Sequence, residues 1–372
     1  MITVKEVRTG KEQREFLNFP LKLYRGNRNY APALYMDEKK IFRPDYVYYD
    51  TSEAVYFNAY KDGEMAGRIS GILQKAANEK NGEERIRFTR YDVIDDVEVS
   101  RALFQAVEDW GRTRGMKEIV GPLGFSDLER EGLLIDGFDK PATFEEQYNA
   151  PYYEKHIEAL GFRTEVEWVE SEVRLKKESM ETLDKMSDMV MERYDLHWGE
   201  ARNTNEFLDK YQDAFFDLLD RSYDKVYGTV PFTPGMRKMM IDNFKLIINM
   251  KYVAVILDKE ENPVCFGICF PALGEALQKS GGKLTPLAIP RVLHAIRRPE
   301  VIDFGLIGVD PAWENRGVSV CMAAGVMHML EDDHIEHAET NLNLVDNAAI
   351  RNLWKRFNAV EHKRRRAYIK EL

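Results

Sequence analysis

Ten residues in the second half of the chain have the pattern of an anion-binding turn. The apolar run 301–309 predicts a strand, and Asp310-Pro-Ala-Trp-Glu-Asn-Arg-Gly-Val-Ser follows it directly. Apolar residues at Val318, Met322 and Val326 then predict a helix that packs one face on a sheet. The free N–H groups and the dipole at a helix start can hold a phosphate or pyrophosphate, and Gly317 would let the backbone approach it. We therefore expect a ligand site at the carboxyl edge of a sheet.

Strands and helices of a recognisable order surround this turn. The β-rich runs 252–257 and 264–270 are separated by turn residues and predict a hairpin before it. After it, residues 336–344 predict another strand, and the spacing of apolar residues in 347–359 predicts a closing helix. The turn would thus lie inside a small mixed sheet.

The first half of the chain repeats the plan. Residues 55–60 and 65–73, joined by Asp62-Gly63, predict a hairpin. Residues 97–114 predict a helix and 117–122 a strand, and the stretch 151–162 ends in Gly161-Phe162, with Gly161 lying 197 positions before Asn358. We therefore predict two copies of one fold.

These elements resemble the Gcn5-related N-acetyltransferase (GNAT) superfamily, in which the turn has the pattern Arg/Gln-x-x-Gly-x-Gly/Ala and its amides hold the CoA pyrophosphate. Glu314, Gly317 and Ser319 stand at the three positions, so only the glycine agrees. Leu23-Tyr-Arg-Gly-Asn, Tyr148-Asn-Ala-Pro-Tyr-Tyr and Tyr227-Gly-Thr-Val-Pro are similar to segments of bacterial two-lobed members. The resemblance implies an α/β (α+β) protein of two tandem GNAT-like domains, residues 1–178 and 179–372, each a mixed, mostly antiparallel twisted sheet flanked by helices.

The resemblance also implies an activity for the C-terminal domain. It would be an N-acyltransferase that uses acetyl-CoA or another acyl-CoA and acts on a small amine or amino-acid-type acceptor. The implied cofactor-binding residues are those of the strand end, the turn and the closing helix: Val309, Glu314, Asn315, Arg316, Gly317, Val318, Ser319 and Asn347. In the N-terminal domain, Ile94-Asp-Asp-Val-Glu has no glycine and three acids at the corresponding turn, so we do not expect CoA there.

Fold position suggests the catalytic groups. Asp303 and Glu339 are candidate bases, and the N–H of Val309 is a candidate oxyanion donor. Trp354 stands where the family has a tyrosine that protonates the leaving thiolate. Because an indole cannot do so, we interpret Trp354 as a core aromatic, and Tyr368 or Tyr227 would have to be the acid.

Two other functions stay open. A degenerate pair could bind a metabolite or peptide between its domains without catalysis, and the departures at Glu314, Ser319 and Trp354 favour this. An aminoacyl transferase that uses charged tRNA is the third, and the net charge of −10 argues against it and against nucleic-acid partners generally. The expected partner is a small molecule, and the sequence does not indicate an oligomeric state.

Composition limits the class of protein further. A chain of 372 residues fits two domains, and no apolar run approaches the ~20 residues needed to span a bilayer. Three cysteines cannot form a disulfide framework, which together with the polar N-terminus predicts a cytoplasmic protein without membrane partners.

Several local patterns have competing interpretations. His334 and His337 could ligate a metal with a nearby carboxylate, but a polar helix end explains them better, so we predict no metal site. Lys363-Arg-Arg-Arg is interpreted as a solvated strand edge, or alternatively as a group that attracts an acidic substrate or the 3′-phosphate of CoA. Residues 271–298 are an insertion that could form a lid or a pocket wall. The stretch 121–150 is unlike a minimal acetyltransferase.

Overall fold

The computed structural model describes residues 1–143, 145–332 and 334–372. Its first lobe contains β1 (Ile2–Glu6), α1 (Gly10–Leu23), α2 (Tyr35–Lys40), β2 (Ser52–Lys61), β3 (Glu64–Gln74), α3 (Lys75–Asn81), β4 (Arg85–Val93), α4 (Val97–Arg112), β5 (Glu118–Gly121), β6 (Leu133–Asp136), α5 (Tyr152–Ala159) and β7 (Arg163–Arg174). The second contains α6 (Lys177–Tyr194), β8 (His197–Trp198), α7 (Thr204–Tyr223), α8 (Pro234–Ile247), β9 (Val253–Leu257), β10 (Pro263–Pro271), α9 (Gly274–Gln278), α10 (Ala288–Arg297), β11 (Val301–Val309), α11 (Val318–Leu330), β12 (His337–Thr340), β13 (Asn343–Leu344), α12 (Ala348–Trp354) and β14 (Asn358–Glu371).

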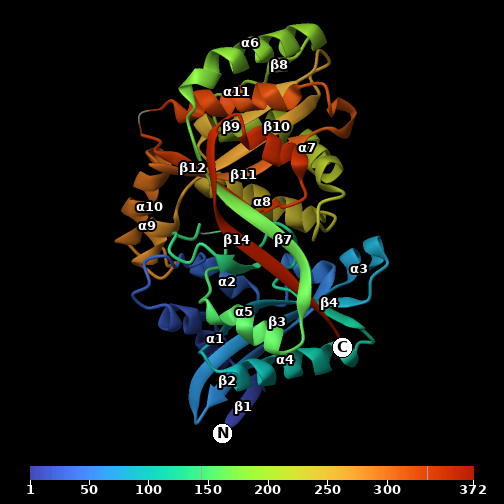
Figure 1. Ribbon diagram of the computed structural model, residues 1–372, viewed down its shortest axis with the longest axis vertical. Helices are drawn as coiled ribbons and strands as arrows, with labels where there is room; N and C mark the ends of the chain where they lie inside the picture. Colours follow the sequence, from blue (N-terminus) through green and yellow to red (C-terminus); the bar gives the residue numbers. More distant parts are fainter. Residues whose placement is uncertain (144, 333) are drawn as a thin grey trace.

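One sheet runs through both lobes (Figure 1). Its described strands follow the order β1-β2-β3-β4-β5-β14-β7-β12-β11-β10-β9-β8. Neighbours are antiparallel except for β4 with β5 and β11 with β12, so each lobe has the same mixed pattern. The predicted fold class and repeat are therefore confirmed.

Local sequence signals set the hairpins. At the turn between β2 and β3, Asp62 and Gly63 both adopt positive φ, 52° and 87°, as a two-residue hairpin turn of this kind requires. The pair β9 and β10 is antiparallel as predicted. The predicted strand 336–344 is wrong in one respect, because it divides into β12 and β13. The chain leaves β11 after Thr340, and β13 pairs with β7 instead.

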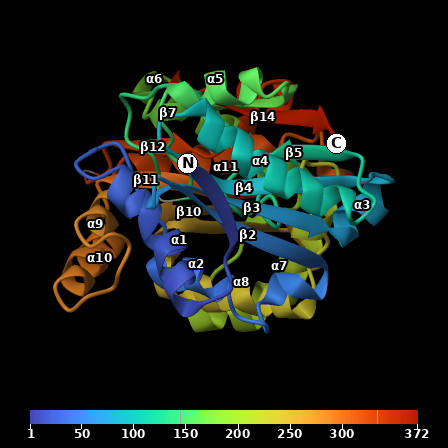
Figure 2. The ribbon, with the colours of Figure 1, turned by 90° about the horizontal axis from the view of Figure 1, so that it is seen from below.

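Helices cover both faces of the second lobe's sheet. On β10, Cys265 packs with residues of α11 and Phe266 with residues of α7, so these helices lie on opposite faces. Helix α6 packs on α11, and Phe244 of α8 stacks on Phe207 of α7. Figure 2 shows α9 and α10 projecting from the body. Among the described residues, no helix combines the length and apolar character needed to cross a bilayer.

The final strand joins the lobes. Residues 358–361 of β14 pair with residues 171–174 at the end of β7, and residues 368–371 pair with β5 of the first lobe. The interpretation of Lys363-Arg-Arg-Arg as a solvated edge is wrong, since strands flank β14 on both sides here, and Lys363 and Arg365 are 1% and 0% exposed. Glu170 compensates both charges, at 3.0 Å from Lys363 Nζ and 2.5 Å from Arg365 Nε.

Candidate active site

Strands β11 and β12 form a fork. They pair in parallel as far as Phe304 and Thr340 and then separate. On the other side of β11, Phe304 pairs with Cys269 and Leu306 with Ile268, which leaves Gly305 as an extra residue. Such a bulge bends the strand, and a Cβ on Gly305 would lie only 2.2 Å from a ring carbon of Phe270. The bulge therefore bends β11 away from β12 and opens a free backbone edge.

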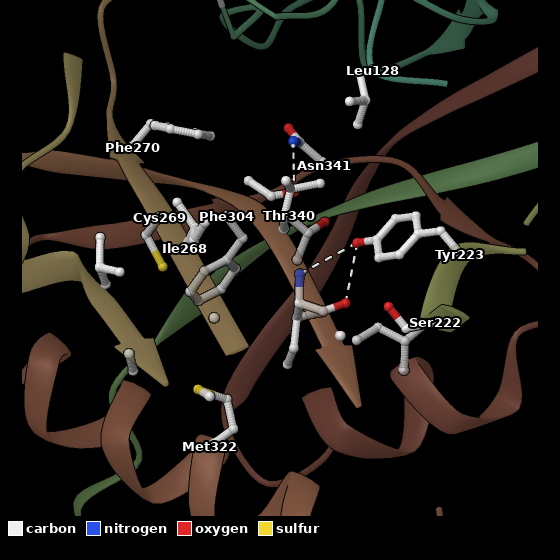
Figure 3. A pocket seen from close by; sticks show the side chains of 18 of the residues that line it. Leu128, Ser222, Tyr223, Ile268, Cys269, Phe270, Phe304, Met322, Thr340 and Asn341 are labelled. Carbon is white, nitrogen blue, oxygen red and sulfur yellow. Dashed lines mark hydrogen bonds between the residues drawn. The ribbon is translucent and has the colours of Figure 1, made fainter. Parts of the chain in front are cut away.

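This free edge carries hydrogen-bonding groups. The N–H of Asp310 donates to Val264 O at 2.9 Å, so the N–H of Val309, which points the opposite way in a strand, faces the fork. The hydroxyl of Tyr223 accepts from the N–H of Ile307 at 3.4 Å and donates to its carbonyl at 3.1 Å (Figure 3). A ligand with amide groups could pair with this edge where Tyr223 does now.

The turn after β11 has the predicted form. A 3₁₀ turn, Pro311–Trp313, leads through Asn315 at φ 61° and Gly317 at φ 87° into α11. The first-turn N–H groups of Val318 and Ser319 precede the helix hydrogen-bond ladder and are available to an anion. Arg316 places its guanidinium over the ring of Trp313, 4.8 Å from the centroid. The backbone thus offers an anion site, while Glu314 remains exposed beside it.

One cavity of about 1170 Å³ contacts both the turn and the fork, and it is larger than the roughly 300–1,000 Å³ of most ligand sites. Apolar side chains of α7, α8 and α11, including Phe215, Phe244 and Met322, make up much of its wall. It contacts most of the predicted site residues, namely Val309, Glu314, Asn315, Gly317, Val318, Ser319, Asn347 and Tyr227. The cavity thus brings the predicted cofactor residues together, except for Arg316, which is not part of its wall.

The first lobe closes this cavity. Its stretch 121–150 contributes Asp127, Leu128, Glu131, Glu145 and Glu146 to the wall. The amide Nδ2 of Asn341 donates to Glu145 Oε2 at 3.1 Å and to Gly305 O at 3.4 Å, which places the carboxylate of Glu145 at the fork. Burial raises the pKa of Glu145 above its ordinary value. Sequence reasoning missed Glu145, and the unusual composition of 121–150 was the only signal.

The two predicted bases lie side by side, one residue before the fork. Asp303 and Glu339 are direct neighbours in the pair of β11 and β12. Burial opposes ionisation of Glu339, but hydrogen bonds from His337 and His362 and the charge of Lys363 lower its pKa. Asp303 is 1% exposed, and burial raises its pKa well above the ordinary value. These surroundings favour the charged form of Glu339 and the neutral form of Asp303, and the catalytic roles of both residues remain predictions.

The predicted acids separate in space. Tyr227 lines the cavity, and burial raises its pKa. Tyr368 lies in β14 opposite Gly121 of β5 and donates to Glu154 Oε1 at 2.8 Å. Trp354 is buried, stacks on Phe304 at 5.0 Å and donates its N–H to Asn343, which confirms it as a core aromatic. Tyr223, the last residue of α7 and four positions before Tyr227 in the sequence, places its hydroxyl at the fork and was not predicted.

The remaining candidate residues contact other side chains or backbone groups of the protein. Asn347 caps α12 by accepting from the N–H of Ile350 at 3.2 Å. His334 Nδ1 lies 3.4 Å from Arg298 and His337 Nε2 lies 3.4 Å from Glu339, so the two imidazoles have different partners. Asp333, which is part of the same run, is outside the described residues. The cysteines are buried, as expected of small core residues.

Comparisons with known proteins agree with this architecture. No family model matches the chain. It is 26% identical over 369 residues to Protein YghO of Escherichia coli (strain K12), covering 96% of this chain and 92% of that protein. It is 26% identical over 310 residues to the Bacterial ceramide synthase of Caulobacter vibrioides (strain NA1000 / CB15N), covering 80% and 77%.

Two solved structures align with the whole length of the chain. A tandem GNAT protein from the clavulanic acid biosynthesis pathway aligns with a TM-score of 0.58 at 11% identity, over 100% of this chain and 98% of that one. A GCN5-related N-acetyltransferase from Sphaerobacter thermophilus aligns with a TM-score of 0.51 at 13% identity, over 100% and 95%. The chain is thus a two-lobed protein with the tandem GNAT fold.

Proposed function

We propose that the chain is an N-acyltransferase that transfers an acyl group from acyl-CoA to an amine in its C-terminal lobe. One observation carries this proposal. A single cavity contacts the amides of the turn, the open edge of β11 and the carboxylate of Glu145. These are an anion site, a surface for the pantetheine amides and a base, which amide synthesis from a thioester needs together.

Each part of the reaction then has a group. The N–H groups of Val318 and Ser319 would hold the pyrophosphate, and the edge at Ile307 would pair with the pantetheine arm. Glu145 would take the proton from the amine as it attacks the thioester carbonyl, and the N–H of Val309 would stabilise the oxyanion. Burial raises the pKa of Tyr223, so its hydroxyl stays protonated and could supply the proton to the leaving thiolate.

The cavity favours substrates with a long apolar chain. Its wall beyond the fork is built from α7 and α8 and includes Phe215, Phe216, Met240 and Phe244. A relative of this chain is named a ceramide synthase, and a ceramide is an amide of a long-chain amine and a fatty acid. We therefore extend the proposal to a fatty acyl donor or a lipid amine acceptor. If the acceptor is a small amine or amino acid, only the acyl chain of the donor would contact this apolar wall.

The test is amide formation by the intact protein. Acetyl-CoA, octanoyl-CoA and palmitoyl-CoA would each be incubated with a long-chain amino alcohol or with amino acids, and CoA release and product mass measured. We expect the longer donors to react fastest. Met240→Trp should shift the preference toward shorter chains, whereas Met189→Trp, on the exposed side of α6, should not. Absence of acyl-CoA binding at millimolar concentration would contradict the proposal and favour a non-catalytic binding protein.

A further inference from the structure

The insertion α9–α10 carries a charge opposite to that of the whole protein. Residues 271–298 contain five lysines and arginines and one acidic residue, Glu275, in a chain whose net charge is −10. The basic residues are Lys279, Lys283, Arg291, Arg297 and Arg298. Gln278 anchors the insertion to the first lobe, donating to Arg28 O and Tyr30 O at 2.9 Å each. This anchoring fixes the position of the basic segment on the molecule.

The same segment exposes large apolar side chains. Leu287 is 82% exposed, and Leu284, Ile289 and Leu293 are 42%, 44% and 43% exposed. These four side chains are not the ones that pack α10 on the protein, because Val292 does so by packing with Leu273 and Leu277. Ile289 and Leu293 are four positions apart and share one outer face of the helix, which Arg297 continues. We call this outer surface of residues 283–298 the α10 patch.

The α10 patch is connected to one end of the cavity. Ile247, at the end of α8, packs with Leu273, Leu277 and Val292 of the insertion. Its neighbour Leu246 is 72% exposed and contributes to the cavity wall, as does Lys251. Exposed apolar and basic side chains therefore extend from the α8 end of the cavity to α9 and α10, which project from the body in Figure 2.

We infer that the α10 patch docks the protein on an anionic phospholipid surface, with the α8 end of the cavity facing the lipid. Apolar side chains that project from a helix insert at the boundary of headgroups and acyl chains, and nearby lysines and arginines are attracted to anionic headgroups. Both features occur together on the α10 patch, and exposed apolar side chains grouped in this way mark interaction sites. This inference goes beyond the proposed function, since binding to a surface does not require catalysis.

The experiment is flotation of the full-length protein with vesicles. Vesicles of phosphatidylcholine alone should bind little protein, and those containing phosphatidylglycerol should bind most of it, less so at high salt. Leu287→Ser with Leu293→Ser should weaken binding by roughly tenfold or more, because the inserted apolar area is lost. Arg297→Glu with Arg298→Glu should weaken binding to the anionic vesicles specifically.

Matched controls exist elsewhere on the surface. Met189 on α6 and Val360 on β14 are 70% and 63% exposed, and Met189→Ser with Val360→Ser should bind vesicles as the wild type does. The inference would be overturned if this control lost as much vesicle binding as the Leu287→Ser, Leu293→Ser variant. It would also be overturned if the wild-type protein floated with neither kind of vesicle. A protein that catalyses amide formation but binds no vesicle would refute the docking alone, and one that binds vesicles without catalysis would refute only the proposed function.

Discussion

The side-chain amide of Asn341 donates a hydrogen bond to Glu145 at 3.1 Å, between residues 196 positions apart in the sequence. Asn341 follows the end of β12 in the second lobe, and Glu145 belongs to a loop of the first. The same amide lies 3.4 Å from the carbonyl of Gly305, in the bulge of β11. The first lobe therefore supplies the carboxylate that lies at the fork of the second lobe.

Replacing Glu145 by glutamine should lower kcat by about 10²–10⁴-fold, because the amine loses its proton acceptor. A base acts only when deprotonated, and burial raises the pKa of Glu145, so the wild-type rate should fall as the pH drops through that raised value. The variant should lack this acidic limb in a profile of initial rate against pH. Glu158→Gln, on the exposed end of α5, is the control, and an unchanged rate in Glu145→Gln would exclude Glu145 as the base.

Gly317→Ala should weaken acyl-CoA binding by about tenfold or more in a calorimetric titration. The backbone at φ 87° disfavours an alanine by about 1–2 kcal/mol, and its Cβ would lie 3.0 Å from Val190 Cγ2, so the turn amides must shift. Gly82→Ala has a comparable φ of 68° but open space around it and no contact with the cavity wall. Gly82→Ala should lower the free energy of unfolding by a similar amount and leave acyl-CoA binding unchanged. Equal affinity in both variants would remove the turn from the binding site.

Tyr223→Phe should reduce kcat by roughly 10²-fold if its hydroxyl protonates the leaving thiolate. Loss of its contacts with Ile307 should also lower the free energy of unfolding by about 1 kcal/mol. Tyr211→Phe, in the same helix, removes a hydroxyl that bonds to Glu200 O at 3.4 Å and lies apart from the cavity wall. Comparable kinetics in the two variants would leave Tyr223 with a structural role only.

Glu339→Gln should affect stability more than turnover. Because the folded pKa of Glu339 is lowered, its carboxylate contributes stability above the unfolded pKa of about 4.3, and this contribution is lost as the pH falls below that value. The variant should therefore be less stable by about 1–3 kcal/mol near pH ~7 and should lose less stability on acidification. Denaturant titrations at several pH values measure this. Full turnover would remove Glu339 from the candidate bases.

Local sequence patterns predicted much of the fold. The turn of Asp62-Gly63, the strand before Asp310 and the helix after Gly317 all depend on residues within a few positions of one another, and the structure confirms them. The burial of Lys363 was not predictable, because a basic run is usually exposed and the carboxylates that neutralise it, on Glu170 and Glu339, come from other strands. Glu145 was missed for the same reason, since its place depends on how two distant segments meet.

The crossing of β14 bears on how the protein is made. A ribosome delivers residues 1–178 first, yet the neighbour of β5 in the finished sheet is residues 368–371, which are synthesised nearly two hundred residues later. Until then the nascent first half has an unfilled position between β5 and β7, a pair of open edges prone to wrong pairing. The first lobe is thus translated before the second, but its sheet is complete only when β14, the last strand of the second lobe, has been synthesised. A gene cut between residues 178 and 179 should yield two insoluble halves that regain structure only when they are co-expressed.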